Sequence, residues 1–130
     1  MPATNDRQGS ARPGLILAHP DPNYTATVSR SFRRLGWAIY SAKNADEVRR
    51  LARRHAPELI VLATDLTGES GWLTCEKLRA EFPAAKLILV IDDPSYPLER
   101  FAHFVGAAAL VSVHSAPAAL LDVVEQPLGV

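Results

Sequence analysis

The sequence predicts an α/β fold: a doubly wound, five-stranded parallel sheet with strand order 2-1-3-4-5 and five alternating helices. Three observations support this prediction. Apolar runs of strand length alternate along the chain with segments whose apolar residues recur every three or four positions. Two of the runs, 58–62 and 86–91, are apolar on both faces, as in strands that helices cover on both sides. The connections are short, and right-handed crossovers then favour this strand order.

The first half of the chain alternates three predicted strands with two predicted helices. Pro20 and Pro22 end the first strand, and Asp21 or Asn23 caps the helix that follows. Asn44 caps the second helix, and a proline ends it. The predicted strands are 14–18, 37–42 and 58–62, and the predicted helices are 24–35 and 45–55.

The second half repeats the alternation after a turn that contains two glycines. Ser70 or Gly71 starts the third helix, and Pro83 ends it. Ser115, with Pro117 in the first turn, opens the last helix. The predicted strands here are 86–91 and 108–113, and the predicted helices are 71–82, 98–105 and 115–125.

The composition is that of one soluble globular domain, with 48% apolar and 22% charged residues in a chain of 130. Fourteen basic residues balance fourteen acidic ones, so the chain has no net charge that would attract nucleic acid or a membrane surface. The single Cys75 excludes an intramolecular disulfide and fits a reducing cytosol. We expect a cytoplasmic protein, since no signal-peptide core and no bilayer-length apolar run is found. We expect a disordered lead-in over 1–13, a folded domain over 14–126 and a tail over 127–130.

Several short motifs occur in a fixed order along this pattern. They are ILAHPDP at 16–22, ADEV at 45–48, PELIVL at 57–62, LTG at 66–68 followed by Gly71, and GA at 106–107. Together they resemble the receiver domain of bacterial response regulators, whose corresponding motifs include "PDLIVLD", "LPG..G" and "GA". The resemblance covers about residues 15–124 and implies a flavodoxin-like, CheY-like fold and a role in two-component signal transduction or a phosphorelay.

The resemblance fails at the positions that carry the family's phosphorylation chemistry. The phosphate-accepting aspartate falls on Ala63, and the metal-binding acidic pair falls on His19 and Pro20. The remaining family positions also carry other residue types: the hydroxyl residue falls on Ile91 or Asp92, the lysine on Val113, the proline after it on His114 and the switching aromatic on Leu110. The chain therefore resembles a degenerate pseudo-receiver that lacks the phosphoacceptor aspartate.

The chemistry of the missing groups predicts a non-catalytic protein. Phosphoryl transfer to a carboxylate needs the nucleophile, a divalent cation to offset charge, and a cation or hydroxyl that holds the product. The sequence also has no glycine-rich phosphate loop, no nucleophile elbow and no paired Cys and His. We therefore expect no enzymatic activity, no cofactor and no bound metal.

Polar residues nevertheless gather where the predicted strands end. His19, Asp21, Asp65, Asp92, Asp93 and His114 should meet at the carboxyl edge of the sheet. Such a cluster suits a small ligand or a transition metal, although polar residues gather at any set of strand-end loops. Asp65, two residues after Ala63, is a displaced acceptor in one interpretation and a solvated turn residue in the other.

Two further surfaces are predicted from the sequence. Tyr96, Phe101 and Phe104 on the fourth helix, with Leu110, suit an apolar contact, since receiver domains resemble one another in docking through the fourth helix, fifth strand and fifth helix. Core filling is the alternative for these residues. Seven arginines form a basic side around the first two helices: Arg30, Arg33, Arg34, Arg49, Arg50, Arg53 and Arg54. A solvated helix face is the simpler interpretation of these arginines.

The resulting hypothesis is a phosphorylation-independent signalling module that acts through protein–protein interaction. Its predicted partners are proteins of a signalling pathway, or a second copy of the chain docked on the fourth helix, fifth strand and fifth helix. No nucleic acid and no membrane is expected to bind within this chain. The alternative is a sensor that binds a small ligand or metal with the His and Asp residues of the sheet edge.

Overall fold

The computed structural model describes residues 12–125. The strands are β1 (Gly14–Ala18), β2 (Ala38–Ala42), β3 (Leu59–Ala63), β4 (Lys86–Ile91) and β5 (Ala109–Ser112). The helices are α2 (Pro22–Arg34), α3 (Ala45–His55), α4 (Gly71–Glu81), α5 (Tyr96–Phe104) and α6 (Ala118–Glu125). The strands form one parallel sheet in the order β2-β1-β3-β4-β5, which confirms the predicted fold class and topology.

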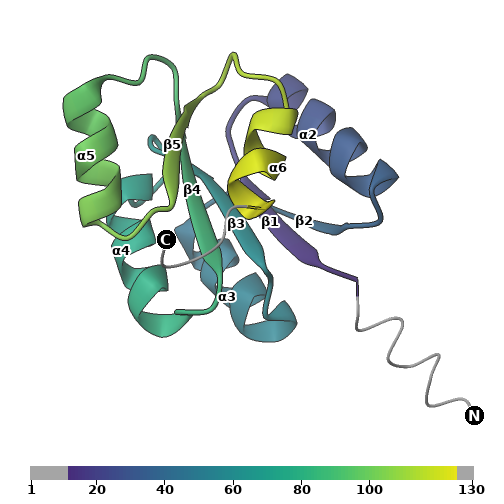
Figure 1. Cartoon of the computed structure of the whole chain (residues 1–130). Coiled ribbons are helices and arrows are strands. Elements are labelled where there is room, and N and C mark those ends of the chain that lie inside the picture. The colour runs from purple at the N-terminus through teal and green to yellow at the C-terminus, as the bar shows by residue number, and fades with distance from the viewer. Residues whose placement is uncertain (1–11, 126–130) are drawn as a thin grey trace, which may run out of the picture.

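Helices cover both faces of the sheet (Figure 1). Alternate residues of a strand point to opposite faces, so Leu15 and Leu17 pack with α2 and α6, whereas Ile16 and Ala18 pack with α3, α4 and α5. The side chains of β1 and β3 are almost completely buried on both faces. This double burial is the physical reason for the continuous apolar runs in the sequence.

The helix boundaries follow local capping chemistry. Asp21 is the N-cap of α2 and accepts a hydrogen bond from the Asn23 N–H, so the helix begins at Pro22 instead of the predicted residue 24. Asn44 caps α3 through the Glu47 N–H at 2.9 Å, as predicted. Ser95 caps α5, which begins two residues before the predicted start because a proline is tolerated in its first turn.

The two predicted end segments lie mainly outside the described residues: residues 1–11 of the lead-in and the tail at 127–130. Arg12 and Pro13 are described and contact the start of β2. The carbonyl of Pro13 accepts a hydrogen bond from the Ala38 N–H at 2.9 Å, and the Arg12 guanidinium reaches the carbonyl of Gly36. These contacts join Arg12 and Pro13 to residues 36–38 at the start of β2.

Cys75 and both tryptophans contribute to packing. Cys75 is fully buried, and burial raises the pKa of its thiol to about 12. Trp37 is buried edge-to-face against Phe32, with ring centres 5.2 Å apart. Trp72 is half-buried and packs against the layer formed by α3, α4 and α5. Among the described residues, no helix is long and apolar enough to cross a lipid bilayer.

Candidate functional site

The carboxyl ends of the parallel strands meet at one edge of the sheet, which encloses a hollow of about 550 Å³. The hollow is lined by His19, Pro20, Asp21, Thr64, Asp65, Val90, Ile91, Asp92, Val113 and His114. Of the positions that the resemblance assigns to the phosphorylation site, Ala63 and Leu110 do not line the hollow, whereas the others do. Five of the six residues expected at the carboxyl edge also line it: His19, Asp21, Asp65, Asp92 and His114. Asp93 does not line the hollow.

Ala63 lies beneath this hollow and not on its wall. It is the last residue of β3, pairs with Val90 of β4 and is only 1% exposed. After β3, the backbone at the start of α4 lies very close to the backbone at the end of β3. The Gly71 N–H donates to the carbonyl of Thr64 at 2.9 Å, and a Cβ on Gly71 would lie 2.0 Å from the carbonyl oxygen of Ala63. The residue on which the resemblance places the nucleophile therefore carries a methyl group in a packed environment.

His19 is the most perturbed group in the hollow. Its Nδ1 accepts a hydrogen bond from the Asp21 N–H at 3.0 Å, so the neutral ring carries its proton on Nε2. Burial lowers the pKa of His19 below its usual 6.5, although the carboxylates of Asp65, Asp21 and Asp92 act in the opposite direction. The His19 imidazole is therefore mainly neutral at pH 7, and no lysine or arginine lines the hollow.

The remaining polar residues of this edge are carboxylates and an exposed imidazole. Asp21, Asp65, Asp92 and His114 are all exposed. Between residues 12 and 125, no group of three or more His, Cys, Asp or Glu side chains is arranged to hold a metal ion. The hollow thus offers three carboxylates as acceptors and the Nε2–H of His19 as a donor, and no lysine or arginine lines it.

Glu69 holds the loop between β3 and α4, a role that the sequence does not reveal. Its carboxylate accepts hydrogen bonds from Thr74 Oγ1 at 2.7 Å, Lys77 Nζ at 2.8 Å and the Arg49 guanidinium at 3.1 Å. The hydrogen bond from Lys77, followed by those from Thr74 and Arg49, lowers the pKa of Glu69 to about 2. Arg49 lies 20 residues away in the sequence, so no local pattern could predict this contact.

The predicted interaction residues separate into an exposed and a buried group. Tyr96, Phe101 and Phe104 are 70%, 45% and 80% exposed, respectively. The Phe101 ring lies 5.1 Å from that of Trp72 on α4 and 6.1 Å from that of Phe104. Leu110 is buried, because β5 directs it into the core against α5, and it does not belong to this surface. The exposed aromatic surface therefore extends from α5 toward α4 and not across β5.

The seven arginines do not form one basic side. The arginines of α3 lie on the opposite layer from those of α2, because the two helices cover different faces of the sheet. On α3, Arg49 pairs with Asp46 at 2.8 Å and Arg53 pairs with Glu81 at 3.1 Å. The predicted basic side is thus divided into a largely neutralised α3 surface and a separate α2 surface.

Comparisons with known proteins point to one kind of domain. No protein-family model matches the chain. The chain is 28% identical over 93 residues to the transcriptional activator protein ExaE of Pseudomonas putida. The aligned residues make up 72% of this chain and 44% of that protein. It is 32% identical over 85 residues to the probable transcriptional regulatory protein TcrX of Mycobacterium tuberculosis. These aligned residues make up 65% of this chain and 36% of that protein. The chain thus spans less than half the length of these curated relatives.

A solved structure shows the same architecture. The response regulator receiver domain protein (CheY-like) from Methanospirillum hungatei superposes with a TM-score of 0.78 at 20% identity, over 86% of this chain and 90% of that one. The strand order β2-β1-β3-β4-β5 is part of the architecture that the two structures share. The chain therefore has the CheY-like, flavodoxin-like fold of response-regulator receiver domains.

Proposed function

We propose that this chain is a receiver-like signalling module that works without accepting a phosphoryl group and acts by binding other proteins. The observation that carries this proposal is the state of the sheet edge. Ala63 occupies the acceptor position and is buried, while His19, Pro20 and Val113 occupy the positions of the acidic pair and the lysine. The scaffold is retained without the groups that phosphoryl transfer requires.

The electrostatics of the hollow support the same proposal. No lysine or arginine lines it, and three of its residues, Asp21, Asp65 and Asp92, are carboxylates. A phosphoryl group on Asp65 would carry two negative charges into this environment without a cation to offset them. The neutral His19 beside it supplies no compensating charge. Asp65 is therefore a poor substitute for an acceptor at Ala63.

The direct experiment is phosphorylation in the presence of Mg²⁺, with acetyl phosphate in one arm and an active histidine kinase in the other. Intact-protein mass spectrometry is the readout, and a receiver domain with its acceptor aspartate is the positive control. We expect no phosphoryl adduct on this chain. Stoichiometric labelling that disappears in Asp65→Asn would overturn the proposal and identify Asp65 as the acceptor.

The interaction part of the proposal is supported by the exposed aromatic surface of α4 and α5. Isolated exposed apolar residues are ordinary, but Tyr96, Phe101 and Phe104 lie on one helix with Trp72 beside them. Aromatic side chains are enriched at the centres of protein interfaces. A second copy of the chain and a different pathway protein are both compatible with this surface.

Sedimentation velocity and affinity capture from the host lysate distinguish these two partners. We expect Phe104→Ser to weaken whichever complex forms, because this side chain is 80% exposed and makes few contacts within the fold. Leu35→Ser on α2 is the matched control, since Leu35 is also exposed, at 57%, but lies on the other layer. Equal loss in both variants would argue against a specific role of α5.

The hollow itself favours a second candidate function, a sensor of a small ligand. Its volume of about 550 Å³ falls within the range of ligand sites. The three carboxylates could accept hydrogen bonds from a donor-rich ligand, and the Nε2–H of His19 could donate one. A thermal-shift screen with divalent metals, nucleotides and quinones tests it, since a ligand that binds the native state raises the midpoint. A rise that His19→Ala and Asp92→Asn abolish would support the sensor.

A further inference from the structure

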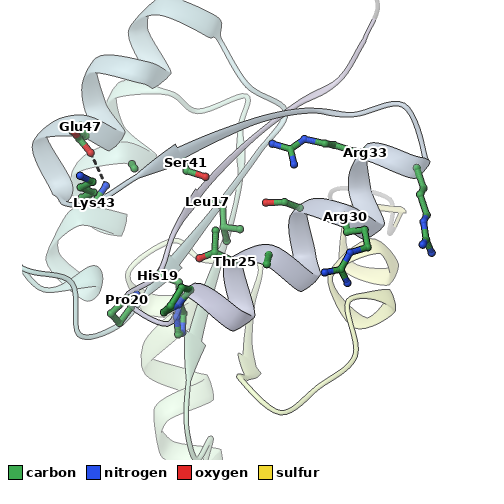
Figure 2. A pocket seen from close by; sticks show the side chains of 14 residues that line it. Leu17, His19, Pro20, Thr25, Arg30, Arg33, Ser41, Lys43 and Glu47 are labelled. Carbon is green, nitrogen blue, oxygen red and sulfur yellow. Dashed lines mark hydrogen bonds between the residues drawn. The ribbon is translucent and has the colours of Figure 1, made fainter.

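A larger groove lies beside the sheet edge, between α2 and the carboxyl end of β2 (Figure 2). Its volume is about 980 Å³. The exposed apolar part of its floor is formed by Pro20, Pro22 and Ala26, whereas Leu17 and Ala42, which also line the groove, are almost completely buried. Figure 2 shows Arg33 reaching from α2 toward β2, while Lys43 and Glu47 lie at the other end of the groove. The groove is separate from the exposed aromatic surface and shares only His19 and Pro20 with the hollow.

Four cationic side chains line this groove, three on α2 and one opposite them. Arg30, Arg33 and Arg34 are spaced so that they lie near one another on the helix, and Lys43 follows β2. All four are exposed, and none of their side chains forms an ion pair or hydrogen bond with another residue in the range 12–125. Their charge is therefore available to a ligand.

The acidic residues near the groove do not neutralise these cations. Glu47 is the sole carboxylate among the described residues that line it. Its Oε1 accepts a hydrogen bond from the backbone N–H of Lys43 at 2.6 Å, and its Oε2 lies 3.9 Å from the guanidinium of Arg50. This arrangement contrasts with α3, where Arg49 and Arg53 have close acidic partners. The unpaired charge is thus a property of the groove and not of every arginine-rich helix in the chain.

Hydroxyl groups accompany the cations. Thr25 and Ser29 of α2 and Ser41 of β2 line the same groove. Arginine forms paired hydrogen bonds with phosphate oxygens, and hydroxyl groups donate to the same oxygens. The apolar floor offers a surface on which a flat ring can rest, and the volume is at the upper end of that of small-molecule sites.

We propose that this groove binds a small molecule with two or more phosphate groups, of the class of the nucleoside polyphosphates. The arginines of α2 and Lys43 would hold the phosphates, and the exposed Pro22 and Ala26 would contact the base. A small anion is favoured over a nucleic-acid strand, because the cations surround one hollow and the whole chain has no net charge to attract an extended polyanion. This inference goes beyond the signalling role proposed above and does not depend on it.

The test is isothermal titration of the full chain with ATP and, separately, with tripolyphosphate. We expect both probes to bind, and their affinities to fall as salt increases, because the contacts are mainly ionic. Tighter binding of ATP than of tripolyphosphate supports a contribution of the base, as proposed. Equal binding would overturn the assignment to nucleoside polyphosphates, because the phosphates alone would then account for the affinity. Absence of binding by either probe at millimolar concentration overturns the proposal.

Variants of matched charge locate the site. The double variant Arg30→Gln and Arg33→Gln should weaken both probes at least tenfold, while the double variant Arg53→Gln and Arg54→Gln should change affinity less than twofold. Arg53 and Arg54 are exposed on α3, on the other layer, so this control removes the same number of positive charges away from the groove. Ser41→Glu, which places a carboxylate in the groove at an exposed strand position, should also abolish binding. Equal losses in all variants, or tighter binding of a polyglutamate peptide than of ATP, would refute a nucleotide site.

Discussion

Replacement of Gly71 by alanine gives a sharp test of how the start of α4 is held against the end of β3. The added Cβ would lie 2.0 Å from the carbonyl oxygen of Ala63 and 2.9 Å from two further backbone atoms. An ordinary contact begins at 3.4 Å, so the two segments would have to separate by about 1.4 Å, the difference between 3.4 and 2.0. All three contact atoms belong to the backbone, so no side-chain rotation relieves the clash.

This separation would also break the hydrogen bond from the Gly71 N–H to the carbonyl of Thr64. Overpacking costs about 1–3 kcal/mol, and the lost hydrogen bond adds about 1 kcal/mol. The helix propensity of alanine offsets part of this cost. We expect Gly71→Ala to lower the free energy of unfolding by about 3 kcal/mol and Tm by roughly 10–15 °C.

Urea denaturation followed by circular dichroism measures this change. Gly14→Ala is the matched control, because a Cβ there would lie 3.5 Å from the Tyr40 ring and 3.6 Å from Pro57, which are ordinary contacts. The control should remain within about 1 kcal/mol of the wild type. If Gly71→Ala unfolds at the same urea concentration as Gly14→Ala, the proposed close approach of β3 and α4 is refuted.

Three further predictions concern the rest of the fold and the sheet edge. Glu69→Gln should destabilise the protein by about 1 kcal/mol at pH 7. Because the folded-state pKa of Glu69, about 2, lies below its ordinary 4.5, this contribution is complete above pH 4.5 and is lost as the pH falls toward 2. Urea titrations at pH 7 and pH 3 should therefore show a smaller difference between variant and wild type at pH 3; a constant difference would contradict the assigned ion pairs. Phe32→Ala should cost about 3–5 kcal/mol in the same assay, because Phe32 is buried against Trp37, and a loss below 1 kcal/mol would argue against this packing. Ala63→Asp alone should remain unlabelled by acetyl phosphate in mass spectrometry, since the new carboxylate would lack a cation; efficient labelling would show that the nucleophile is the one missing group.

The order of strands and helices could be predicted from the sequence because its causes are local. A buried strand needs an apolar run, and Asn44 and Ser70 cap helices through N–H groups three residues further along the chain. Capping residues and chain breakers of this kind also predicted most boundaries of the strands and helices to within two residues. The strand order followed from short connections of fixed handedness, which leave few topologies for five alternating strands and helices.

The composition of the sheet edge could also be predicted, because parallel strands bring their carboxyl ends together whatever their sequences. His19, Asp65, Asp92 and His114 line one hollow for this reason. The sequence did not reveal that Ala63 is buried below that hollow, or that His19 is held neutral by burial. Those properties depend on neighbours from several strands and loops.

The tertiary structure alone decided which surfaces are available to partners. Phe104 and Leu110 are six residues apart in apolar segments, yet one is exposed on α5 and the other is buried beneath it. The arginines of α2 and α3 have similar spacing, yet α3 meets acidic residues of α4 and its preceding loop, while α2 faces a groove without such partners. The α/β scaffold could be predicted from residue type and local spacing, and the loss of the phosphorylation residues stays a prediction from the same spacing. Only packing decided which side chains face water, because burial depends on contacts between segments far apart in the chain.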